Sequence, residues 1–595
     1  MKKSGTAEAD AFVSLETKVF FFMQQEGMTM ARKKKNTING AQLTVQVLIE
    51  QGVQTVFGYP GGMVVDLYDA LYQSRDRIRH VLTAHEQGAA HAADGYARAT
   101  GMVGVVMATS GPGATNLVTG LATAMLDSVP LVAITGNVPT RLIGKDAFQE
   151  INITGITLPI TKHNYFVQDV NELADTIREA FRIAKSGRPG PVLIDIPKDI
   201  QLADCVYEPQ PVVQPFDTPK VPGNQIAEAV ALLQKAKKPY LYIGGGAAAC
   251  GLGDQVSVLA EKLDACIGCS LMGLSAIPRR APRFLGMEGM HGALAANLAM
   301  QQADLIFGIG VRFSDRATGN TDRFGKDAVI LQLDTDLSEI NKNVKVKLGM
   351  IGDIAEALSA IADAVAPQSH PQWQQTLLSL KAQQAAAGAV RTSPCSPADL
   401  IDVINHCKDD ETIIATDVGQ HQMWTAQSIA LSRPRKFISS GGLGTMGFGL
   451  GAAIGASIGT GCRAILVTGD GSFGMNLTEL ATAVTYGVPV VIVLLNNGTL
   501  GLVRQTQRLF FDRRYAETTL NRQTDFVRVA EAFGANAQRV TDPEAFRAAL
   551  KTALQADGPT LIEVPIDIDE PVLPMRLPGG AVDELITDLS QEELS

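Results

Sequence analysis

The sequence predicts an α/β protein with three doubly wound parallel-sheet domains, and three observations support this fold class. Short apolar runs rich in β-branched residues alternate with helical segments over most of the 595 residues, a pattern typical of parallel sheets covered on both faces. Two proline-containing stretches divide the pattern into three blocks. Hydrophobic residues make up 46% of the chain and charged residues 19%, so each block has enough apolar side chains for its own core.

The blocks are separated by two segments of distinct composition. The first linker holds five prolines between Tyr207 and Pro222, which indicates a stiff, extended chain. The second is rich in Gln, Ala and Pro. The expected divisions are an N-terminal extension at 1–37, a first domain at 38–205, a linker at 206–222, a second domain at 223–366, a linker at 367–397, a third domain at 398–575 and a C-terminal tail at 576–595.

Expected buried strands are short apolar runs that end at turn-forming residues. A helix is expected between the last two of them, over Asn476–Val484. The strands lie at 55–57, 104–108, 131–134 and 192–196 in the first domain, at 240–243, 305–309 and 329–333 in the second, and at 464–468 and 489–495 in the third.

The N-terminal extension carries no clear structural pattern. Its apolar run, Val19–Met23, is too short for the hydrophobic region of a signal peptide. Met28 and Met30 are alternative translation starts, so we expect residues 1–37 to be disordered or to precede the true start.

Charge and cysteine content exclude several classes of protein. The net charge of −10 argues against nucleic acid and anionic membrane surfaces as partners. The seven scattered cysteines favour reduced thiols in a cytoplasmic protein. The uncharged stretch Ser439–Gly461 has Gly-x-x-x-Gly spacings that resemble a membrane-helix motif. Because it is glycine-rich and lies within the α/β pattern, we expect a buried loop and helix there.

The most informative motif is Gly469–Ser472, which follows one expected strand, together with Asn496–Asn497, which follows the next. In a parallel sheet the carboxyl ends of strands form one crevice, so Asp470 and Asn497 would converge there. A carboxylate and an amide oxygen suit Mg²⁺, which leaves room for phosphate ligands. Each turn alone is ordinary, but the pair at this spacing favours a site. It resembles the diphosphate–metal motif of thiamine-diphosphate enzymes.

A second chemical signal is Glu86, within the segment Ala84–Ala90. Small and apolar neighbours would desolvate its carboxyl and raise its proton affinity, so that it could exchange a proton near neutral pH. An isolated glutamate at a helix start more often interacts with the helix dipole alone. In thiamine-diphosphate enzymes a glutamate of the first domain bonds the cofactor's aminopyrimidine ring and promotes deprotonation of its reactive carbon. The resemblance assigns this role to Glu86.

Further motifs narrow the resemblance to one family. In their order, over about residues 38 to 580, they are similar to the catalytic subunits of acetohydroxyacid synthase, also called acetolactate synthase. The motifs are Phe57–Gly62, Ser110–Asn116, Asp146–Glu150, Thr161–Asn164, Ser186–Pro191, Leu285–Gly292, Val311–Gly319, Asp417–Trp424 and Gly442–Gly447.

The resemblance implies a transferase that decarboxylates pyruvate and joins the two-carbon unit to a second pyruvate, or to 2-ketobutyrate, at the first common step of branched-chain amino acid biosynthesis. It implies thiamine diphosphate, Mg²⁺ and FAD as cofactors. It also implies a homodimer or tetramer with active sites at the subunit interface, and a small regulatory subunit as a partner. The alternatives are an FAD-independent catabolic acetolactate synthase or another thiamine-dependent 2-keto acid carboligase or decarboxylase.

The resemblance also assigns roles to individual residues of the active site. Met446 would wedge between the rings of the cofactor, although as an isolated methionine it would be expected in the core. Arg316 would bind the acceptor carboxylate. The other assigned residues are Gly62, Gln420, His421, Gly444, Gly471 and Ser472 for thiamine diphosphate, Asp470, Asn497 and the carbonyl of Thr499 for Mg²⁺, and Phe148, Gln149, Lys162 and Met290 around the substrate.

One motif admits a different interpretation. Gly442–Gly447 fits the G-x-G-x-x-G pattern of dinucleotide-binding folds and follows the strand-like Lys436–Ser439. A flavin–nicotinamide oxidoreductase would therefore be an alternative, to be recognised by NAD(P)H turnover. A catalytically inactive homologue is a further alternative, but it would need Glu86 or Asp470 replaced.

The FAD assignment rests on the second domain. Gly244, Gly245, Arg312, Asp334 and Asp353 stand at positions matching the family. The glycine triplet Gly244–Gly246 after a strand is in itself only suggestive of close phosphate approach. The family pattern Arg-Phe-Asp-Asp-Arg is changed here, because Ser314 replaces one aspartate.

The clearest departure from the family is Thr506, where biosynthetic members usually carry tryptophan. That tryptophan packs against the extra methyl group of 2-ketobutyrate, in a region that includes Leu502 and Val503. One methylene in an apolar pocket is worth roughly 1–3 kcal/mol. We therefore expect a weak preference for 2-ketobutyrate over pyruvate. Asn137 and Gly451 also depart from the family, with effects that the sequence does not predict.

Overall fold

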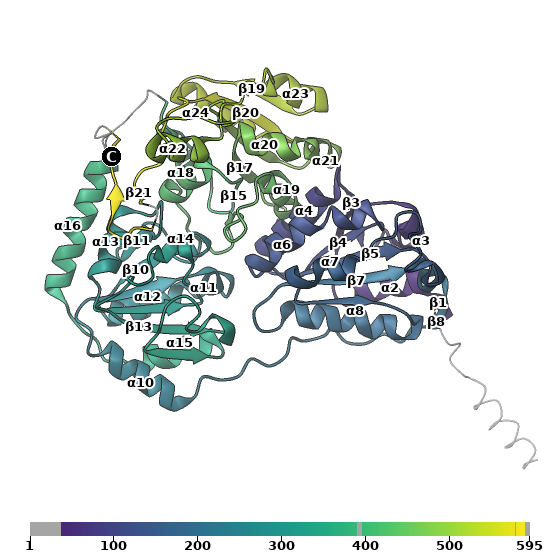
Figure 1. Ribbon diagram of the computed structural model, residues 1–595, viewed down its shortest axis with the longest axis horizontal. Coiled ribbons are helices and arrows are strands. Elements are labelled where there is room, and N and C mark those ends of the chain that lie inside the picture. The colour runs from purple at the N-terminus through teal and green to yellow at the C-terminus, as the bar shows by residue number, and fades with distance from the viewer. Residues whose placement is uncertain (1–36, 389–394, 578, 590–595) are drawn as a thin grey trace, which may run out of the picture.

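The computed structural model describes residues 37–388, 395–577 and 579–589. It contains three six-stranded parallel sheets, one in each expected domain (Figure 1). This confirms the predicted fold class. The expectation for the N-terminal extension falls outside the described residues apart from Thr37, which begins the short strand β1.

The first domain has the sheet order β3-β2-β4-β5-β7-β6, with all neighbouring pairs parallel. A small antiparallel pair, β1 with β8, lies outside this sheet. The elements are β1 (Thr37–Asn39), α2 (Gly40–Glu50), β2 (Thr55–Tyr59), η1 (Gly62–Val64), α3 (Val65–Gln73), β3 (Arg79–Leu82), α4 (Glu86–Thr100), β4 (Gly104–Ala108), α5 (Pro112–Thr115), α6 (Val118–Leu126), β5 (Leu131–Asn137), η2 (Thr140–Leu142), α7 (Ile153–Thr157), η3 (Leu158–Ile160), β6 (His163–Phe166), α8 (Val170–Lys185), β7 (Pro191–Pro197), α9 (Lys198–Leu202) and β8 (Asp204–Val206).

The second domain has the order β11-β10-β9-β12-β13-β14, again parallel throughout. The proline-rich segment before it runs as an extended chain between the two domains in Figure 1. The elements are α10 (Gly223–Leu233), β9 (Pro239–Ile243), α11 (Gly245–Ala249), α12 (Gly253–Lys262), β10 (Cys266–Cys269), η4 (Leu271–Gly273), β11 (Phe284–Met287), α13 (Leu294–Gln302), β12 (Leu305–Ile309), α14 (Asp315–Thr318), β13 (Val329–Asp334), η5 (Leu337–Glu339), β14 (Leu348–Ile351), α15 (Ile354–Ala364) and α16 (Pro371–Gly388).

The third domain has the order β16-β15-β17-β18-β20-β19, and all its pairs are parallel. A short antiparallel pair, β21 with β22, follows it. The elements are α17 (Pro397–Cys407), β15 (Ile413–Thr416), α18 (Gln420–Ser428), β16 (Phe437–Ile438), α19 (Phe448–Thr460), β17 (Ala464–Gly469), α20 (Asp470–Asn476), η6 (Leu477–Glu479), α21 (Leu480–Thr485), β18 (Val490–Asn496), α22 (Gly501–Phe510), α23 (Phe526–Phe533), β19 (Asn536–Arg539), α24 (Pro543–Ala553), β20 (Thr560–Pro565), β21 (Met575–Arg576) and β22 (Leu585–Ile586).

Local sequence explains where many helices begin. Asn39 caps α2 with a reciprocal pair of hydrogen bonds to Gln42, of 2.9 and 3.2 Å. At the starts of α8, α15 and α17, the side chains of Asp169, Asp353 and Ser396 each accept one backbone N–H group, without the reciprocal bond. The expected strands are buried along nearly their whole length because helices cover both faces of each sheet.

Two segments are more structured than the sequence indicated. The second expected linker, 367–397, is largely helical, because α16 places Trp373, Leu377 and Leu380 in the apolar core of the second domain. The expected tail from residue 576 begins within β21, where Arg576 is almost fully buried at 1% exposure. In both cases tertiary contacts, and not local pattern, order the chain.

The first and third domains meet through α4 and α19, which lie side by side in Figure 1. Glycines allow this approach. A Cβ atom on Gly455 would lie 1.8 Å from the carbonyl oxygen of Ala92, and one on Gly95 would lie 2.1 Å from that of Ala452. The uncharged stretch is therefore a buried, closely packed helix, as expected. Among the described residues, no helix is both long and apolar enough to cross a membrane.

Candidate active site

The carboxyl ends of β17 and β18 bring together the two most informative turns. Asp470 follows Gly469 directly and begins α20, which ends at Asn476. The helix expected over Asn476–Val484 is present as η6 and α21, so α20 is an additional helix that the sequence did not predict. The helix dipole of α20 favours a carboxylate at its first position. Burial raises the pKa of Asp470 to about 6, against the opposite effect of backbone N–H groups that include Gly498 just beyond β18. The two turns therefore meet where the parallel order of β17 and β18 predicts.

Asn497 is held in place by its neighbours. Its Nδ2 donates to Oε1 of Gln420 at 3.0 Å, and its Oδ1 accepts the backbone N–H of Thr499 at 3.3 Å. Gln420, the first residue of α18, also donates to the backbone oxygen of Glu570 at 2.9 Å. Its amide therefore connects the loops after β15, β18 and β20.

The donor set at this crevice suits a hard cation with few protein ligands. The described residues contain no cluster of three or more His, Cys, Asp or Glu side chains that could hold a metal ion. Asp470 instead supplies one carboxylate, beside the amide of Asn497 and the backbone of Thr499. Mg²⁺ accepts such a set because water and phosphate oxygens complete its octahedron.

His421 provides a polar atom that lacks a partner. Its Nε2 is buried and makes no hydrogen bond to the described residues. Burial lowers the pKa of His421 to about 3, so the ring is neutral at ordinary pH. Leaving a buried polar atom unpaired costs stability, which indicates a polar ligand at this position. Ser472 differs, because its hydroxyl already donates to the backbone oxygen of Val418 at 2.7 Å.

The loop before α19 reaches the same crevice. Met446 is half-buried, and its Cε lies 3.7 Å from where a Cβ on Gly471 would stand. Gly444 has φ +70°, a left-handed conformation that favours glycine. The Met446 side chain therefore lies near Gly471 of the other loop, and its own loop contains Gly444 in a glycine-favouring conformation.

Asp417 organises this loop and was not singled out as a site residue. Its Oδ1 accepts the backbone N–H groups of Gly447 at 2.7 Å and Gly449 at 3.3 Å, and its Oδ2 accepts the hydroxyl of Thr468. Burial raises the pKa of Asp417 to about 6, while these hydrogen bonds lower it. The available signal was its place directly after an apolar run, at the head of the Asp417–Trp424 motif.

Glu86 is half-buried at the first position of α4, as expected, but its contacts lie in its own domain. Its Oε2 accepts Nδ2 of Asn116 at 2.9 Å. Gly113 lies beside the other oxygen of Glu86: a Cβ atom added to Gly113 would stand 3.1 Å from Oε1. Gly62, which begins η1 in the same domain, has open space around an added Cβ.

Glu479 of the third domain, which the sequence analysis missed, braces the segment before Glu86. It accepts the backbone N–H groups of Ala84 and His85 at 3.2 and 3.0 Å. Its position after Asn476 gave no local indication of this contact, which depends on the docking of two domains.

The residues assigned to the substrate fall into separate groups. Arg316 and Met290 are together, with Nη1 of Arg316 at 3.8 Å from Sδ of Met290. Phe148 is 82% exposed on a loop of the first domain, next to Gln149 with a left-handed φ of +61°. Within one chain, the described contacts do not join Phe148 to Arg316.

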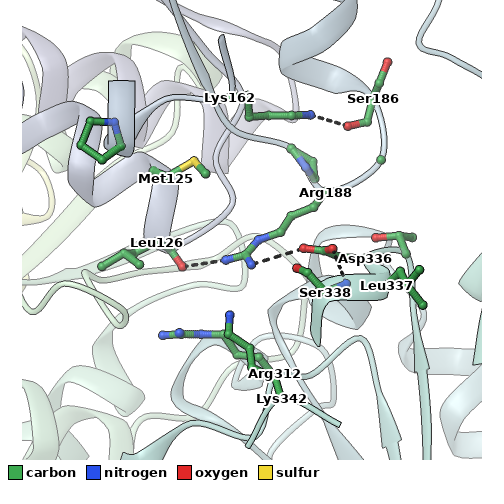
Figure 2. A pocket seen from close by; sticks show the side chains of 14 residues that line it. Met125, Leu126, Lys162, Ser186, Arg188, Arg312, Asp336, Leu337, Ser338 and Lys342 are labelled. Atoms are coloured by element: carbon green, nitrogen blue, oxygen red, sulfur yellow. Dashed lines mark hydrogen bonds and ion pairs between the residues drawn. The ribbon is translucent and has the colours of Figure 1, made fainter. Parts of the chain in front are cut away.

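Lys162 and Arg312 line a cavity of about 580 Å³ between the first and second domains (Figure 2). Nζ of Lys162 donates to the backbone oxygens of Ile183 and Ser186, both at 2.6 Å. Burial lowers the pKa of Lys162 to about 8. Arg188 crosses the cavity to Glu339 of the second domain at 2.8 Å. The cavity is therefore strongly basic, with acidic groups at one edge.

The other residues assigned to FAD have structural partners of their own. Asp334 accepts the backbone N–H groups of Thr335 and Asp336 at 2.8 and 3.0 Å, and Asp353 caps α15. Burial raises the pKa of Asp334. A Cβ atom added to Gly244 would lie 2.3 Å from the backbone oxygen of Gly310, and one added to Gly245 would lie 3.1 Å from Cβ of Met272. Packing of the loop therefore requires glycine at position 244 whether or not a phosphate binds there.

The specificity residues lie on α22. Thr506 is half-buried, and its hydroxyl donates to the backbone oxygen of Leu502 at 3.0 Å. Because its own helix satisfies that hydroxyl, Thr506 presents a less polar surface than a free threonine. Val503 is 51% exposed.

Comparisons with known proteins agree with this geometry. Three family models match in chain order: the N-terminal TPP binding domain of thiamine pyrophosphate enzymes over residues 38–156, their central domain over 226–361, and their C-terminal TPP binding domain over 417–564.

Full-length relatives decide the family. The chain is 46% identical to the acetolactate synthase isozyme 2 large subunit of Escherichia coli (strain K12), with 93% of this chain and 100% of that protein covered. It is 44% identical to the isozyme 1 large subunit of the same strain, over 95% of this chain and 100% of the relative. The chain belongs to the acetolactate synthase large-subunit family.

A third relative is similar over nearly the whole chain. A probable acetolactate synthase large subunit of Methanocaldococcus jannaschii is 43% identical over 93% of this chain and 96% of its own length. All three domains of an acetolactate synthase large subunit are therefore present, and the dinucleotide interpretation of Gly442–Gly447 is not needed.

Proposed function

We propose that this protein condenses two pyruvate molecules to 2-acetolactate and CO₂, with 2-ketobutyrate as a second acceptor. The observation that carries the proposal is the convergence of Asp470, Asn497, Gln420 and Met446 at the strand ends of the third domain, beside the unpartnered nitrogen of His421. The family membership supports the same activity.

The crevice fits thiamine diphosphate with Mg²⁺. Asp470, Asn497 and the carbonyl of Thr499 would hold the metal, while His421, Gln420 and the backbone around Gly471 would hold the diphosphate. When bound, the cofactor acts as an electron sink for decarboxylation of a 2-keto acid. The protein supplies orientation and excludes water, since the polar groups here are buried.

Glu86 would exchange a proton with the aminopyrimidine ring. Asn116 donates to one carboxylate oxygen and so fixes the orientation of the other. Within one chain the described contacts of Glu86 remain in the first domain. A site shared between two copies, with Glu86 from one and Asp470 from the other, accounts for this arrangement.

The acceptor 2-keto acid would bind at Arg316. A guanidinium offers two parallel donors to a carboxylate, which suits recognition of a 2-keto acid. Met290 lies against that guanidinium and would contact the carbon chain. Phe148, which is highly exposed in one chain, would cover the site from a second copy.

We also propose FAD in the second domain. Arg312 on the basic cavity, Gly244 and Gly245 at the start of α11, and Asp334 and Asp353 at neighbouring strand ends support it. Ser314 weakens the case, so the FAD-independent catabolic enzyme is the second candidate. A small regulatory subunit would complete the assembly, since the relatives are named large subunits.

An omission assay tests the proposal. Purified protein would be freed of cofactors with a chelator and dialysis, then given pyruvate with each cofactor omitted in turn. Acetolactate formation should require thiamine diphosphate and Mg²⁺, and the protein as purified should be yellow if it holds FAD. Acetolactate formation without added thiamine diphosphate by protein shown to be free of it would contradict the proposal.

A further inference from the structure

A buried arginine outside the three sheets contacts both segments that carry the residues assigned to the acceptor. Arg576, in β21, is 1% exposed. Its Nη1 donates to the backbone oxygen of Ala317 at 2.7 Å, and its Nη2 donates to those of Asp315 and Arg316 at 3.0 and 3.1 Å. Its own backbone N–H donates to the backbone oxygen of Met290 at 2.8 Å.

These contacts reach both residues of the acceptor site. The backbone N–H of Met290 donates to the backbone oxygen of Arg316 at 2.8 Å. The guanidinium of Arg576 therefore binds α14, which carries Arg316, and the backbone N–H of Arg576 binds the segment that carries Met290. Three hydrogen bonds from one planar guanidinium define the position of α14 more closely than a single contact would.

The charge of Arg576 is not balanced by a conventional ion pair. Its Nε is buried and makes no hydrogen bond to the described residues. Its favourable charge interaction is strongest with Glu288, which lies just beyond β11 and is 3% exposed. Neither carboxylate oxygen of Glu288 makes a hydrogen bond of normal geometry to any residue that the structure describes. Arg316 lies near enough for its positive charge to repel that of Arg576, which lowers the pKa of Arg576.

Glu288 is the group in this cluster whose charge changes near neutral pH. Burial raises the pKa of Glu288 to about 8, while the Tyr242 hydroxyl and Arg576 lower it. The other groups that face it are Tyr240 and Tyr242 from β9 and Cys269 from β10, and burial raises the pKa of each far above that range. His291, nearby in sequence, has its pKa lowered to about 4 by burial and is neutral too.

We propose that Arg576 is a positioning residue for the acceptor site and that the buried carboxyl of Glu288, two residues before Met290, sets the net charge beside Arg576. This inference rests on the proposed role of Arg316. With Glu288 protonated, two arginine charges favour the acceptor carboxylate. With Glu288 ionised, one of them is neutralised and the acceptor binds more weakly.

Two variants test the proposal in the full-length enzyme with its cofactors. Arg576→Met should raise the KM for pyruvate roughly 10-fold while CO₂ release at saturation stays within about twofold, because acceptor binding and not decarboxylation is affected. CO₂ should also exceed acetolactate, with the excess two-carbon unit protonated and released as acetaldehyde. An unchanged KM and an equal yield of the two products would overturn the positioning role.

Glu288→Gln keeps the shape and removes the titration, so it remains informative if Arg576→Met does not fold. In wild type the KM for pyruvate should rise as pH passes through about 8, and in Glu288→Gln this rise should be smaller or absent. Lys162 has a pKa near the same value, so the difference between the two profiles is the measurement. Identical profiles would refute the role of Glu288.

Two further variants separate the possible failures. Glu50→Gln breaks a buried pair with Arg178 in the first domain, at 2.8 Å, and should alter stability without changing the KM. Arg316→Gln tests the site itself. If it leaves KM unchanged, the acceptor assignment and this inference both fail. If it raises KM while Arg576→Met does not, only the inference fails.

Discussion

At the scale of single residues, Thr506, which we expect to affect acceptor preference, differs from the tryptophan of the family in size more than in polarity. The hydroxyl of Thr506 is bound to the backbone of Leu502, so the position lacks apolar volume without gaining a free polar group. Without the apolar surface of a tryptophan side chain, the pocket discriminates less between pyruvate and 2-ketobutyrate, which differ by one methylene.

Thr506→Trp should therefore raise the ratio of 2-aceto-2-hydroxybutyrate to acetolactate, by about 10-fold or more, when pyruvate and 2-ketobutyrate compete. The measurement is the product ratio at equal acceptor concentrations. A ratio that does not move would show that another residue forms the apolar surface of the pocket.

The buried carboxyl of Glu288 makes stability depend on pH. Its folded-state pKa of about 8 exceeds the ordinary value of 4.5, so between these values the folded chain holds a proton that the unfolded chain releases. Stability is therefore highest below the ordinary value and falls as pH rises to about 8. Glu288→Gln removes this loss, and its stability relative to wild type should increase by about 2–4 kcal/mol between pH 5 and pH 8.5.

Denaturant unfolding of both proteins across this pH range measures the difference. Glu50→Gln provides a control, because the pKa of Glu50 is shifted in the opposite direction from that of Glu288. Burial would raise the pKa of Glu50, but hydrogen bonds from Arg178 and Gln210 outweigh it and lower that pKa. Stability from Glu50 should thus be lost toward acid pH. Parallel curves for wild type and Glu288→Gln would mean that Glu288 keeps its ordinary pKa in the folded protein.

At the scale of elements, periodicity predicted central strands such as β4, β5, β17 and β18, because parallel strands buried on both faces are continuous apolar runs. It did not mark β3, β10 or β20, whose runs are short or contain polar residues. It did not predict that α20 begins at Asp470, since a Gly-Asp-Gly segment has low helix propensity and the strand before it positions the first turn. It also treated α16 as linker, because its alanine- and glutamine-rich face has no strong pattern of its own.

The packing of α4 on α19 yields a test at this scale. Gly455→Ala places a methyl group onto the backbone of Ala92, so it should destabilise the protein by about 1–3 kcal/mol despite the better helix propensity of alanine. Gly223→Ala, in α10 with open space around the new Cβ, should be neutral or slightly stabilising. Thermal unfolding of the two variants makes the comparison, and equal midpoints would show that the helices can separate at little cost.

At the scale of the whole molecule, the first and third domains are joined in one chain, yet Glu86 and Asp470 do not contact one another. The motifs predict which residues belong to a site, and the structure brings Asp470, Asn497 and Gln420 close together. They did not predict that Glu479 binds the segment before Glu86, because that contact forms only when the first and third domains dock. They also missed Asp417, whose partners Gly447, Gly449 and Thr468 are distant in sequence but lie in the same domain.

Complementation tests the shared site. Glu86→Gln and Asp470→Ala should each be nearly inactive. Dissociated, mixed and reassociated as dimers, they should recover roughly a quarter of wild-type activity, since half of the dimers are mixed and each has one intact site. Each variant treated alone gives the baseline. No recovery in dimers shown to be mixed would place Glu86 and Asp470 of the same chain in one site.

The close contact between α4 and α19 also determines the order in which the chain can mature. The ribosome completes α4 long before α19 exists, so the alanine- and glycine-lined surface of α4 stays uncovered through most of synthesis. Contacts of such long sequence separation close late. Nascent chains that end before Phe448 therefore carry an exposed apolar helix face, and this is the stage at which aggregation or chaperone capture competes with folding.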